Sequence, residues 1–304
     1  MRVGFIGNSS LSGQITDSLK QTGHKVTGGY QSSKGTRLKG PEEHPSAESL
    51  INSSDLVYVA NDDLPLFEIC KIAIKESRHL YIESPFFLDY ELINHLYHLA
   101  NESKSVIRLA QKLMAHPVYM PVRFELNPLY FNIRMDFPST SPSFDYLRNS
   151  LFNIISIVWD SVHRDLRKMS YMPLEYNTPY PRAFLFDMDF ENGSRGNILF
   201  NHLSDQAFFK AEFMRMAKRF LLDFTASELL AYDEEDGPEW SSPGESETEA
   251  DLIGEDFRNF LTDLDENLLP LTVNEDNQKI LSLTHTLLNE MYVKNAVSGM
   301  NPAK

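Results

Sequence analysis

The chain has a single cysteine, Cys70, which excludes an internal disulfide framework and any metal site built from cysteines alone. It also lacks an apolar run long enough to cross a membrane as a helix, so we expect no membrane span. The opening residues MRVGFIGNSS have neither a basic leader nor an apolar signal core. These absences predict a cytoplasmic protein that is stabilised by its apolar core, and 304 residues suffice for two domains.

Basic residues are scarce, since 28 lysines and arginines stand against 43 aspartates and glutamates. A net charge of −15 repels a phosphate backbone, so nucleic-acid binding is not expected. Eleven of the acids lie in residues 232–256, which contain no base, and without this segment the net charge is −4. Its composition, rich in Ser, Pro and Gly, favours a solvated loop or a disordered excursion, and a docking segment for a basic partner is the alternative.

Residues 1–118 alternate short apolar runs with segments of helical spacing. Runs such as LVYVA at 56–60 are continuous rather than alternating, which is typical of strands covered on both faces. This alternation predicts an α/β domain with a doubly wound parallel sheet. We expect strands at 2–6, 25–30, 56–60, 79–82 and 105–110, and helices at 65–76 and after Asp89.

The pattern changes near Pro117, and residues 119–304 predict an α+β domain with an open antiparallel sheet. Residues 122–137 alternate loosely, like an antiparallel strand pair or one long strand. Asn192-Gly193 predicts a hairpin turn, because both residues tolerate positive φ. We further expect a helix at 147–159, hairpin strands at 183–190 and 197–203, one or two strands within 208–224, and helices at 255–265 and 275–296.

The first loop, Gly7 to Gly13, is the place to look for a ligand, because doubly wound sheets bind ligands beyond the carboxyl ends of their strands. The dinucleotide fingerprint G-x-G-x-x-G needs a second glycine where the backbone approaches the pyrophosphate. Here Ser9 stands at that place, and the third glycine comes one position late. The loop alone leaves both nucleotide binding and a purely structural role open.

Several segments, taken in their order along the chain, are similar to those of one known family. They are DLVYVANDD at 55–63, AIKESRHLYIESP at 73–85, AQKLMAHPVY at 110–119, FENGSRG at 190–196 and DFRNFLTDL at 256–264. No single segment is specific, but the ordered set covers most of the chain. The sequence therefore resembles the glucose–fructose oxidoreductase and inositol dehydrogenase (Gfo/Idh/MocA) family.

The resemblance implies a Rossmann-type nicotinamide domain and hydride transfer between NAD or NADP and a sugar-like or other hydroxy or keto compound. It also implies a homodimer or homotetramer formed through the sheet of the second domain. The implied cofactor-binding positions are Gly7, Asn8, Ser9, Ser10, Leu11, Asn61, Glu83 and Pro85.

The loop after the second strand bears on the choice of cofactor. An NAD site usually carries an acid there that accepts from the ribose hydroxyl. This chain has Ser32 and Lys34 instead, with further basic residues nearby, which suits a 2′-phosphate and favours NADP. An ordinary solvated basic loop is the alternative interpretation.

The departures from the family pattern concern the groups that move protons. Ser84 replaces the lysine of the family's E-K-P motif, although Glu83 and Pro85 are present. Counting back from Trp159, Arg148, Phe152 and Ile155 fall on the positions of the family's D-x-x-x-H-x-x-D pattern. A shift by one residue puts Asn149 and Asn153 on its first two positions, again without a histidine. We therefore expect a member with degenerate catalytic residues, and the alternative is an inactive homologue that serves as a metabolite-binding, protein-interaction or regulatory protein.

Two residues could take over the missing proton transfer. Lys112 follows the strand expected at 105–110, beside the strand that precedes Ser84, and His116 lies shortly after it. A solvated lysine and a structural linker histidine are the alternatives. His163, near Asp160 and Asp165, suggests surface charge rather than a catalytic triad, and we expect no metal site.

Overall fold

The computed structural model describes residues 1–7, 15–16, 19, 23–31, 42–60, 63–84, 89–138, 144–174, 182–235, 237–241, 248–269 and 272–299. The chain forms two compact units. The first comprises Met1–Lys112 and Glu249–Leu281, and the second comprises Leu113–Thr248 and Ser282–Lys304. The sequence suggested a contiguous division after residue 118. In the structure the first unit also contains residues 249–281, because a helix within this segment packs its apolar side on the parallel sheet.

The first unit contains a five-stranded parallel sheet in the order β2-β1-β3-β4-β5, which confirms the predicted doubly wound arrangement. Its central strands are buried on both faces, as their continuous apolar runs predict. The strands are β1 (Arg2–Ile6), β2 (Lys25–Tyr30), β3 (Leu56–Val59), β4 (His79–Ile82) and β5 (Ile107–Leu109).

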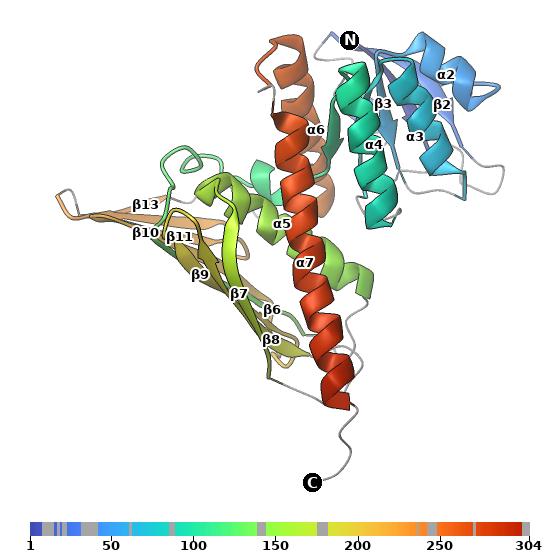
Figure 1. The fold of residues 1–304 in the computed structure, drawn as a ribbon. Coiled ribbons are helices and arrows are strands. Elements are labelled where there is room, and N and C mark those ends of the chain that lie inside the picture. The colour runs from blue at the N-terminus through green and yellow to red at the C-terminus, as the bar shows by residue number, and fades with distance from the viewer. Residues whose placement is uncertain are drawn as a thin grey trace. The chain divides into compact units, whose positions relative to one another are not determined.

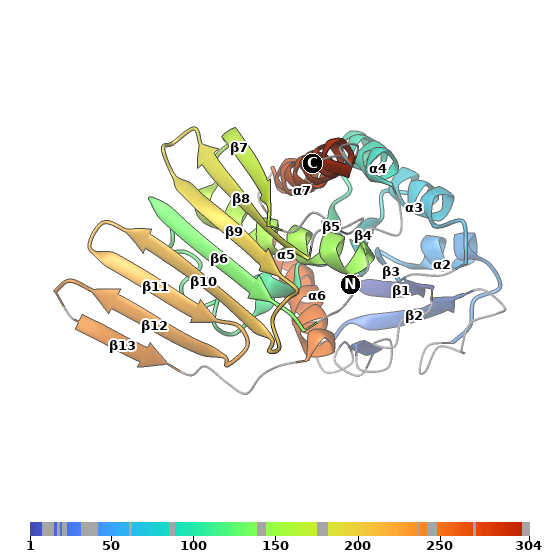
Figure 2. The same cartoon turned by 90° about the horizontal axis from the view of Figure 1, so that it is seen from below.

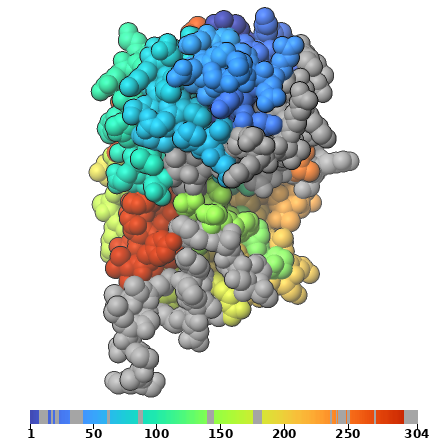
Figure 3. All heavy atoms as spheres, turned by 90° about the vertical axis from the view of Figure 1, so that its right-hand side faces the viewer, coloured from blue at the N-terminus to red at the C-terminus, as the bar shows by residue number. Residues whose placement is uncertain are grey.

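Three helices lie side by side along this sheet: α2 (Ala47–Ser53), α3 (Leu66–Lys75) and α4 (Tyr90–Ser103) (Figure 1). Figure 3 shows their outer surface in blue to blue-green. Ser46 caps α2, since its hydroxyl accepts from the Ser49 amide at 3.1 Å. Asp89 is the N-cap of α4, as predicted from the sequence, although its side chain makes no capping hydrogen bond.

A second layer of the first unit is formed by α6 (Glu249–Asp265). Phe257 packs edge-on against Tyr58 and Tyr81, whose rings stack 5.2 Å apart on neighbouring strands β3 and β4. These side chains belong to one buried cluster with Phe5 and Phe260. Burial of aromatic area of this kind contributes the largest stabilising free energy in a core.

The second unit is built on an eight-stranded sheet in the order β13-β12-β11-β10-β6-β9-β8-β7 (Figure 2). Every neighbouring pair is antiparallel except β6 and β9, which run parallel. The strands are β6 (Tyr130–Asp136), β7 (Leu166–Pro173), β8 (Ala183–Phe190), β9 (Arg195–Asn201), β10 (Phe208–Arg215), β11 (Lys218–Asp223), β12 (Glu228–Asp233) and β13 (Gly237–Ser241).

Helix α5 (Phe144–Val162) lies along one face of this sheet, and its residues 150–159 are almost all buried (Figure 2). No described helix covers the other face. The predicted β8–β9 hairpin is confirmed: Gly193 has φ +87°, and the Asn192 side chain accepts from the Ser194 amide at 3.1 Å. The last helix, α7 (Val273–Gly299), is longer than the predicted 275–296.

Two sequence expectations for the second unit are corrected. Residues 117–125 form turns, so the alternation from 122 did not mark a strand, and only β6 is extended. The acidic segment is not one loop, because residues 232–233 end β12, 237–241 form β13 and 249–256 begin α6. Residues 236 and 242–247 lie outside the described residues.

Candidate nucleotide site

The carboxyl ends of β1 and β3 form the switch point of the parallel sheet. The chain leaves β1 for β2 on one side, and β3 pairs with β1 on the other side. Gly7 lies at this point with φ +89°, and its amide donates to the Tyr30 carbonyl at 2.9 Å. A left-handed backbone favours glycine, and a pyrophosphate-binding loop begins with a glycine of this kind. This local geometry fits a dinucleotide.

The neighbouring end of β4 carries Glu83. The Glu83 amide donates to the Val59 carbonyl at 2.9 Å and so extends the β3–β4 ladder by one residue. The hydroxyl of Tyr58 donates to Glu83 Oε2 at 2.7 Å and holds the carboxylate at the carboxyl end of β4. Ser84 follows and is half-buried. Of the other predicted cofactor residues, Asn8, Ser9, Ser10, Leu11, Ser32, Lys34, Asn61 and Pro85 lie outside the described residues.

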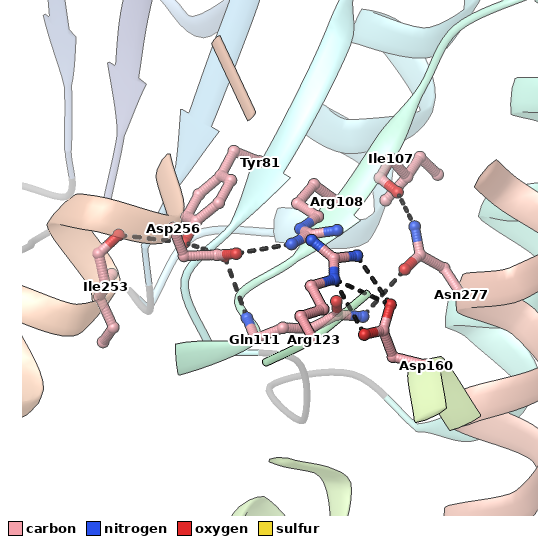
Figure 4. A network of polar contacts seen from close by, with 9 residues as sticks. All are labelled: Tyr81, Ile107, Arg108, Gln111, Arg123, Asp160, Ile253, Asp256 and Asn277. Carbon is pink, nitrogen blue, oxygen red and sulfur yellow. Dashed lines mark hydrogen bonds and ion pairs between the residues drawn. The ribbon is translucent and has the colours of Figure 1, made fainter. Parts of the chain in front are cut away.

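A buried carboxylate, Asp256 of α6, connects the ends of β4 and β5 (Figure 4). It accepts from Tyr81 Oη at 2.8 Å, from an Arg108 guanidinium nitrogen at 2.7 Å and from the Gln111 amide at 3.0 Å. Its side chain is 1% exposed, and Arg108 supplies the opposite charge that a buried carboxylate requires. Burial, followed by the Asp256 charge, raises the pKa of Tyr81 well above its ordinary value, so the phenol remains a donor.

The same network continues into α7. Gln111 Nε2 donates to Asn277 Oδ1 at 3.0 Å, and Asn277 Nδ2 donates to the Ile107 carbonyl at 2.9 Å (Figure 4). Sequence reasoning missed this network, although Asp256 interrupts an otherwise apolar side of its helix between Ile253 and Phe257. An acid in such a position is a signal for a buried polar contact. The network fixes the backbone just before Lys112.

The two proton-transfer candidates belong to different units. Lys112 is half-buried and begins a short 3₁₀ helix, Lys112–Ala115. His116 is 4% exposed, accepts from the Val118 amide at 3.3 Å and packs edge-on against Phe224. Burial lowers the pKa of His116 to about 4, and a hydrogen bond to the Phe224 backbone opposes this shift only in part. These surroundings suit a structural histidine, and the catalytic role of either residue stays a prediction.

Helix α5 carries the residues that the sequence resemblance aligns with a histidine pattern. Phe152 and Ile155 are fully buried in the core, and Arg148 pairs with Asp145 at 2.9 Å. Phe152 and Ile155 are therefore core residues.

A second polar cluster, which sequence reasoning did not identify, lies at the other end of α5. Asp160 accepts from Tyr119 Oη at 2.7 Å and makes a bidentate ion pair with Arg123, whose shortest distance is 2.7 Å (Figure 4). Tyr119 is fully buried, and burial together with Asp160 raises its pKa. His163 is exposed. The Asp160 cluster holds the turns at 117–125 on α5, which is the geometry of a structural ion pair.

The described residues also bear on metal binding, on the cysteine and on membrane-spanning helices. No group of three or more His, Cys, Asp or Glu side chains among them could hold a metal ion. Cys70 is buried, and burial raises the pKa of its thiol to about 12, so it is an inert thiol. None of the described helices combines the length and the apolar character needed to span a membrane.

No family model and no curated protein matches the sequence. The fold, however, is similar to those of solved dehydrogenases. UDP-N-acetylglucosamine 3-dehydrogenase from Acidithiobacillus ferrooxidans superposes with a TM-score of 0.79 at 16% identity, over 97% of this chain and 99% of that one. A dehydrogenase (MviM) from Clostridium difficile gives 0.75 at 15% identity, over 95% and 99% of the two chains.

Biliverdin reductase from Synechocystis, solved with biliverdin and NADP+, gives a TM-score of 0.69 at 15% identity, over 97% and 98% of the chains. The likeness thus extends over both units and nearly the whole of each compared protein. At these identities it establishes the two-domain architecture, a parallel sheet followed by a large mixed sheet, and confirms the fold class predicted from the sequence.

Proposed function

We propose that this protein is a nicotinamide-dependent oxidoreductase of the Gfo/Idh/MocA type that acts on a small hydroxy or keto compound. The observation that carries the proposal is Gly7, whose left-handed backbone lies at the switch point of the parallel sheet. The shared fold supports it, since the compared proteins include dehydrogenases and a reductase solved with NADP+.

In this proposal the backbone at Gly7 approaches the pyrophosphate, and Asn8 to Leu11 continue that loop. Glu83, held by Tyr58, is placed to orient the cofactor at the end of β4, and the resemblance adds Asn61 and Pro85 to the cofactor-binding residues. Ser32 and Lys34 would accept a 2′-phosphate, which favours NADP over NAD. A bound nicotinamide supplies the hydride donor or acceptor, a chemistry that side chains lack.

The proton of the substrate hydroxyl needs a different carrier from the family's lysine, because Ser84 occupies that position. Lys112 is our proposed carrier, since the Asp256–Gln111 contact fixes the backbone immediately before it. General acid–base catalysis contributes about 10²–10⁴-fold to a rate, so Lys112→Ala should lower kcat by about a hundredfold without changing cofactor affinity.

A second candidate function is an inactive homologue that binds a metabolite or a regulatory partner. The specific observation in its favour is the pair Phe152 and Ile155, which are buried apolar residues where the family has proton-transferring groups. Turnover of any hydroxy or keto compound with NADPH would exclude this alternative, and cofactor binding without turnover across a broad panel would support it.

The test of the nucleotide site compares two glycines of the same backbone geometry. Gly7 and Gly193 have φ of +89° and +87°, so Gly7→Ala and Gly193→Ala impose a similar conformational cost, about 1 kcal/mol. Only Gly7 lies at the proposed site. Titration of NADPH and NADH, followed by nicotinamide fluorescence, should show at least about tenfold weaker binding for Gly7→Ala, which corresponds to about 1.4 kcal/mol. Gly193→Ala should bind like the unmodified protein.

Two outcomes would refute nicotinamide binding. One is that the unmodified protein binds neither cofactor. The other is that both glycine variants bind as the unmodified protein does. A preference for NADH over NADPH would leave the site in place and contradict only the assignment of Ser32 and Lys34.

A further inference from the structure

A polar hollow of about 340 Å³ lies in the face of the large sheet that no described helix covers. It extends over the neighbouring strands β7, β8 and β9 (Figure 2). Two rows of side chains that face one another across these strands line it. The first row is Lys168, Asp189 and Arg195, and the second is Ser170, Asp187 and Asn197. None of these residues belongs to the candidate nucleotide site.

Two charges in the hollow lack a counter-ion. Lys168 is exposed, and its ammonium has no partner in the part of the chain that the structure describes. The Asp187 carboxylate accepts from Ser170 Oγ at 3.3 Å and meets no lysine or arginine among the described residues. Asp189, by contrast, forms an ion pair with Arg195 at 3.0 Å. The hollow therefore presents one unpaired cation and one unpaired anion.

This arrangement differs from the rest of the sheet. The other acids of β6, β8, β10 and β11 each form an ion pair: Asp136 with Arg134, Asp189 with Arg195, Glu212 with Arg219 and Asp223 with Lys210. Opposite charges on neighbouring strands stabilise a sheet when they pair in this way. Lys168 and Asp187 also lie on neighbouring strands, and the structure keeps them apart across the hollow.

The two charges restrict what the hollow can bind. A simple anion is attracted by Lys168 and repelled by Asp187, and a simple cation meets the reverse. A ligand that carries both charges satisfies both groups. The two rows are two residues apart along the strands, which is about 7 Å. An ammonium and a carboxylate on the same carbon atom, each about 2.8 Å from its partner, span a gap of this size.

Neighbouring side chains prepare both ends of this site. The Ser170 hydroxyl donates to Asp187 and orients its carboxylate for a cation. Arg195 uses its Nε for Asp189, but a guanidinium has five N–H donors, so Arg195 retains donors for a ligand carboxylate beside Lys168. The volume of the hollow is at the small end of the range for ligand sites, which suits a ligand of few atoms.

We propose that this hollow binds a free α-amino acid as its zwitterion, with the carboxylate at Lys168 and Arg195 and the ammonium at Asp187. The site goes beyond the proposed nicotinamide binding and does not depend on it. A second copy of the chain is the other source of partners for the two unpaired charges, and the experiment separates the two.

The test uses the full chain without nicotinamide. The standard amino acids are titrated first in pools and then singly, and binding is followed by isothermal calorimetry. The matched controls are the amide of the amino acid that binds, which lacks the carboxylate, and its N-acetyl derivative, which lacks the ammonium. We expect at least one amino acid to bind in a saturable way. The Kd of each control compound should be about tenfold higher or more.

Two variants test the residues. Asp187→Asn and Lys168→Met each remove one charge from an exposed side chain and keep its approximate length. Each should raise the Kd of the amino acid about tenfold or more. Glu228→Gln is the control, since Glu228 is an exposed acid of β12 outside the hollow, and it should bind like the unmodified protein.

The proposal fails if no amino acid binds at millimolar concentration or if the amide or the N-acetyl derivative binds equally well. It also fails if Glu228→Gln weakens binding as much as the two variants in the hollow. Sedimentation velocity supplies the remaining comparison. If Asp187→Asn and Lys168→Met dissociate an oligomer that binds no amino acid, the two charges pair with a second copy of the chain, and the proposal is wrong.

Discussion

At the scale of single residues, His116 couples stability to pH. Its folded pKa of about 4 lies below the ordinary value of 6.5, so the unfolded chain binds more protons between these limits. The contribution of His116 to the free energy of unfolding is therefore fully present above pH 6.5 and is lost as the pH falls toward 4. The shift corresponds to about 3 kcal/mol at most. Urea unfolding at pH 7.5 and at pH 4.5 should show this loss in the unmodified protein.

The control for this prediction is His116→Phe, which has no group to titrate at that position. Burial also lowers the pKa of His79 and His202, so the variant keeps part of the pH dependence. The unmodified protein should nevertheless lose clearly more stability on acidification than the variant. Equal losses would mean that His116 does not carry the effect.

At the scale of elements, one carboxylate connects α6 to the parallel sheet. Removal of Asp256 leaves Arg108 as a buried charge without its partner and the Tyr81 hydroxyl without its acceptor. Loss of one member of a buried ion pair costs about 3–5 kcal/mol, so Asp256→Ala should reduce the free energy of unfolding by this amount. Urea denaturation measures it.

Glu255→Ala is the matched control on the same helix. Glu255 pairs with Arg258 on the exposed side of α6, where an ion pair contributes at most about 0.5 kcal/mol. If Asp256→Ala does not fold, Asp256→Asn keeps the shape and one acceptor and should show an intermediate loss. An Asp256 variant as stable as Glu255→Ala would contradict the role of the network.

At the scale of the whole molecule, the uncovered face of the large sheet suggests self-association. Met172, Leu185 and Leu199 lie in register on neighbouring strands and form an apolar row across that face. Next to the row is a hollow of about 340 Å³, whose lining includes Lys168, Asp187 and Arg195 among others. Because it carries both signs of charge, this face offers ion-pair partners to a second copy of itself. We propose that it pairs with a second copy of the chain.

Leu199→Glu places a charge in the middle of the row and should convert the dimer or tetramer to a monomer in sedimentation velocity. Leu92→Glu, on α4, is the control, since Leu92 is 37% exposed and lies outside this face. The proposal is wrong if the unmodified protein sediments as a monomer at all concentrations. It is also wrong if Leu92→Glu dissociates the protein equally.

The sequence predicted the parallel sheet well for a physical reason. Strands such as β3 and β4 are covered on both faces. Their sequences are therefore continuous apolar runs, which differ from the alternating pattern of a half-exposed strand. The same reasoning failed at residues 122–126, because two or three alternating residues fit a turn as well as a strand. It also failed at β12 and β13, where high charge concealed an exposed hairpin at the edge of the sheet.

The site was less predictable than the fold. Gly7 was identified from its place after a strand, since chain order fixes where a strand ends. Asp256 was missed, because periodicity shows which face a side chain occupies and not which partners it meets.

By itself, the sequence determined the strands of the parallel sheet, the hairpin at Gly193 and the serine at position 84, where the resembled family has a lysine. Only the tertiary structure decided that residues 249–281 join the first unit and that Asp256 is buried against Arg108. The reason is that local patterns reflect the interactions of a residue with its near neighbours. The environment of a buried polar group is set instead by segments more than a hundred residues apart, as the contact between Arg108 and Asp256 shows.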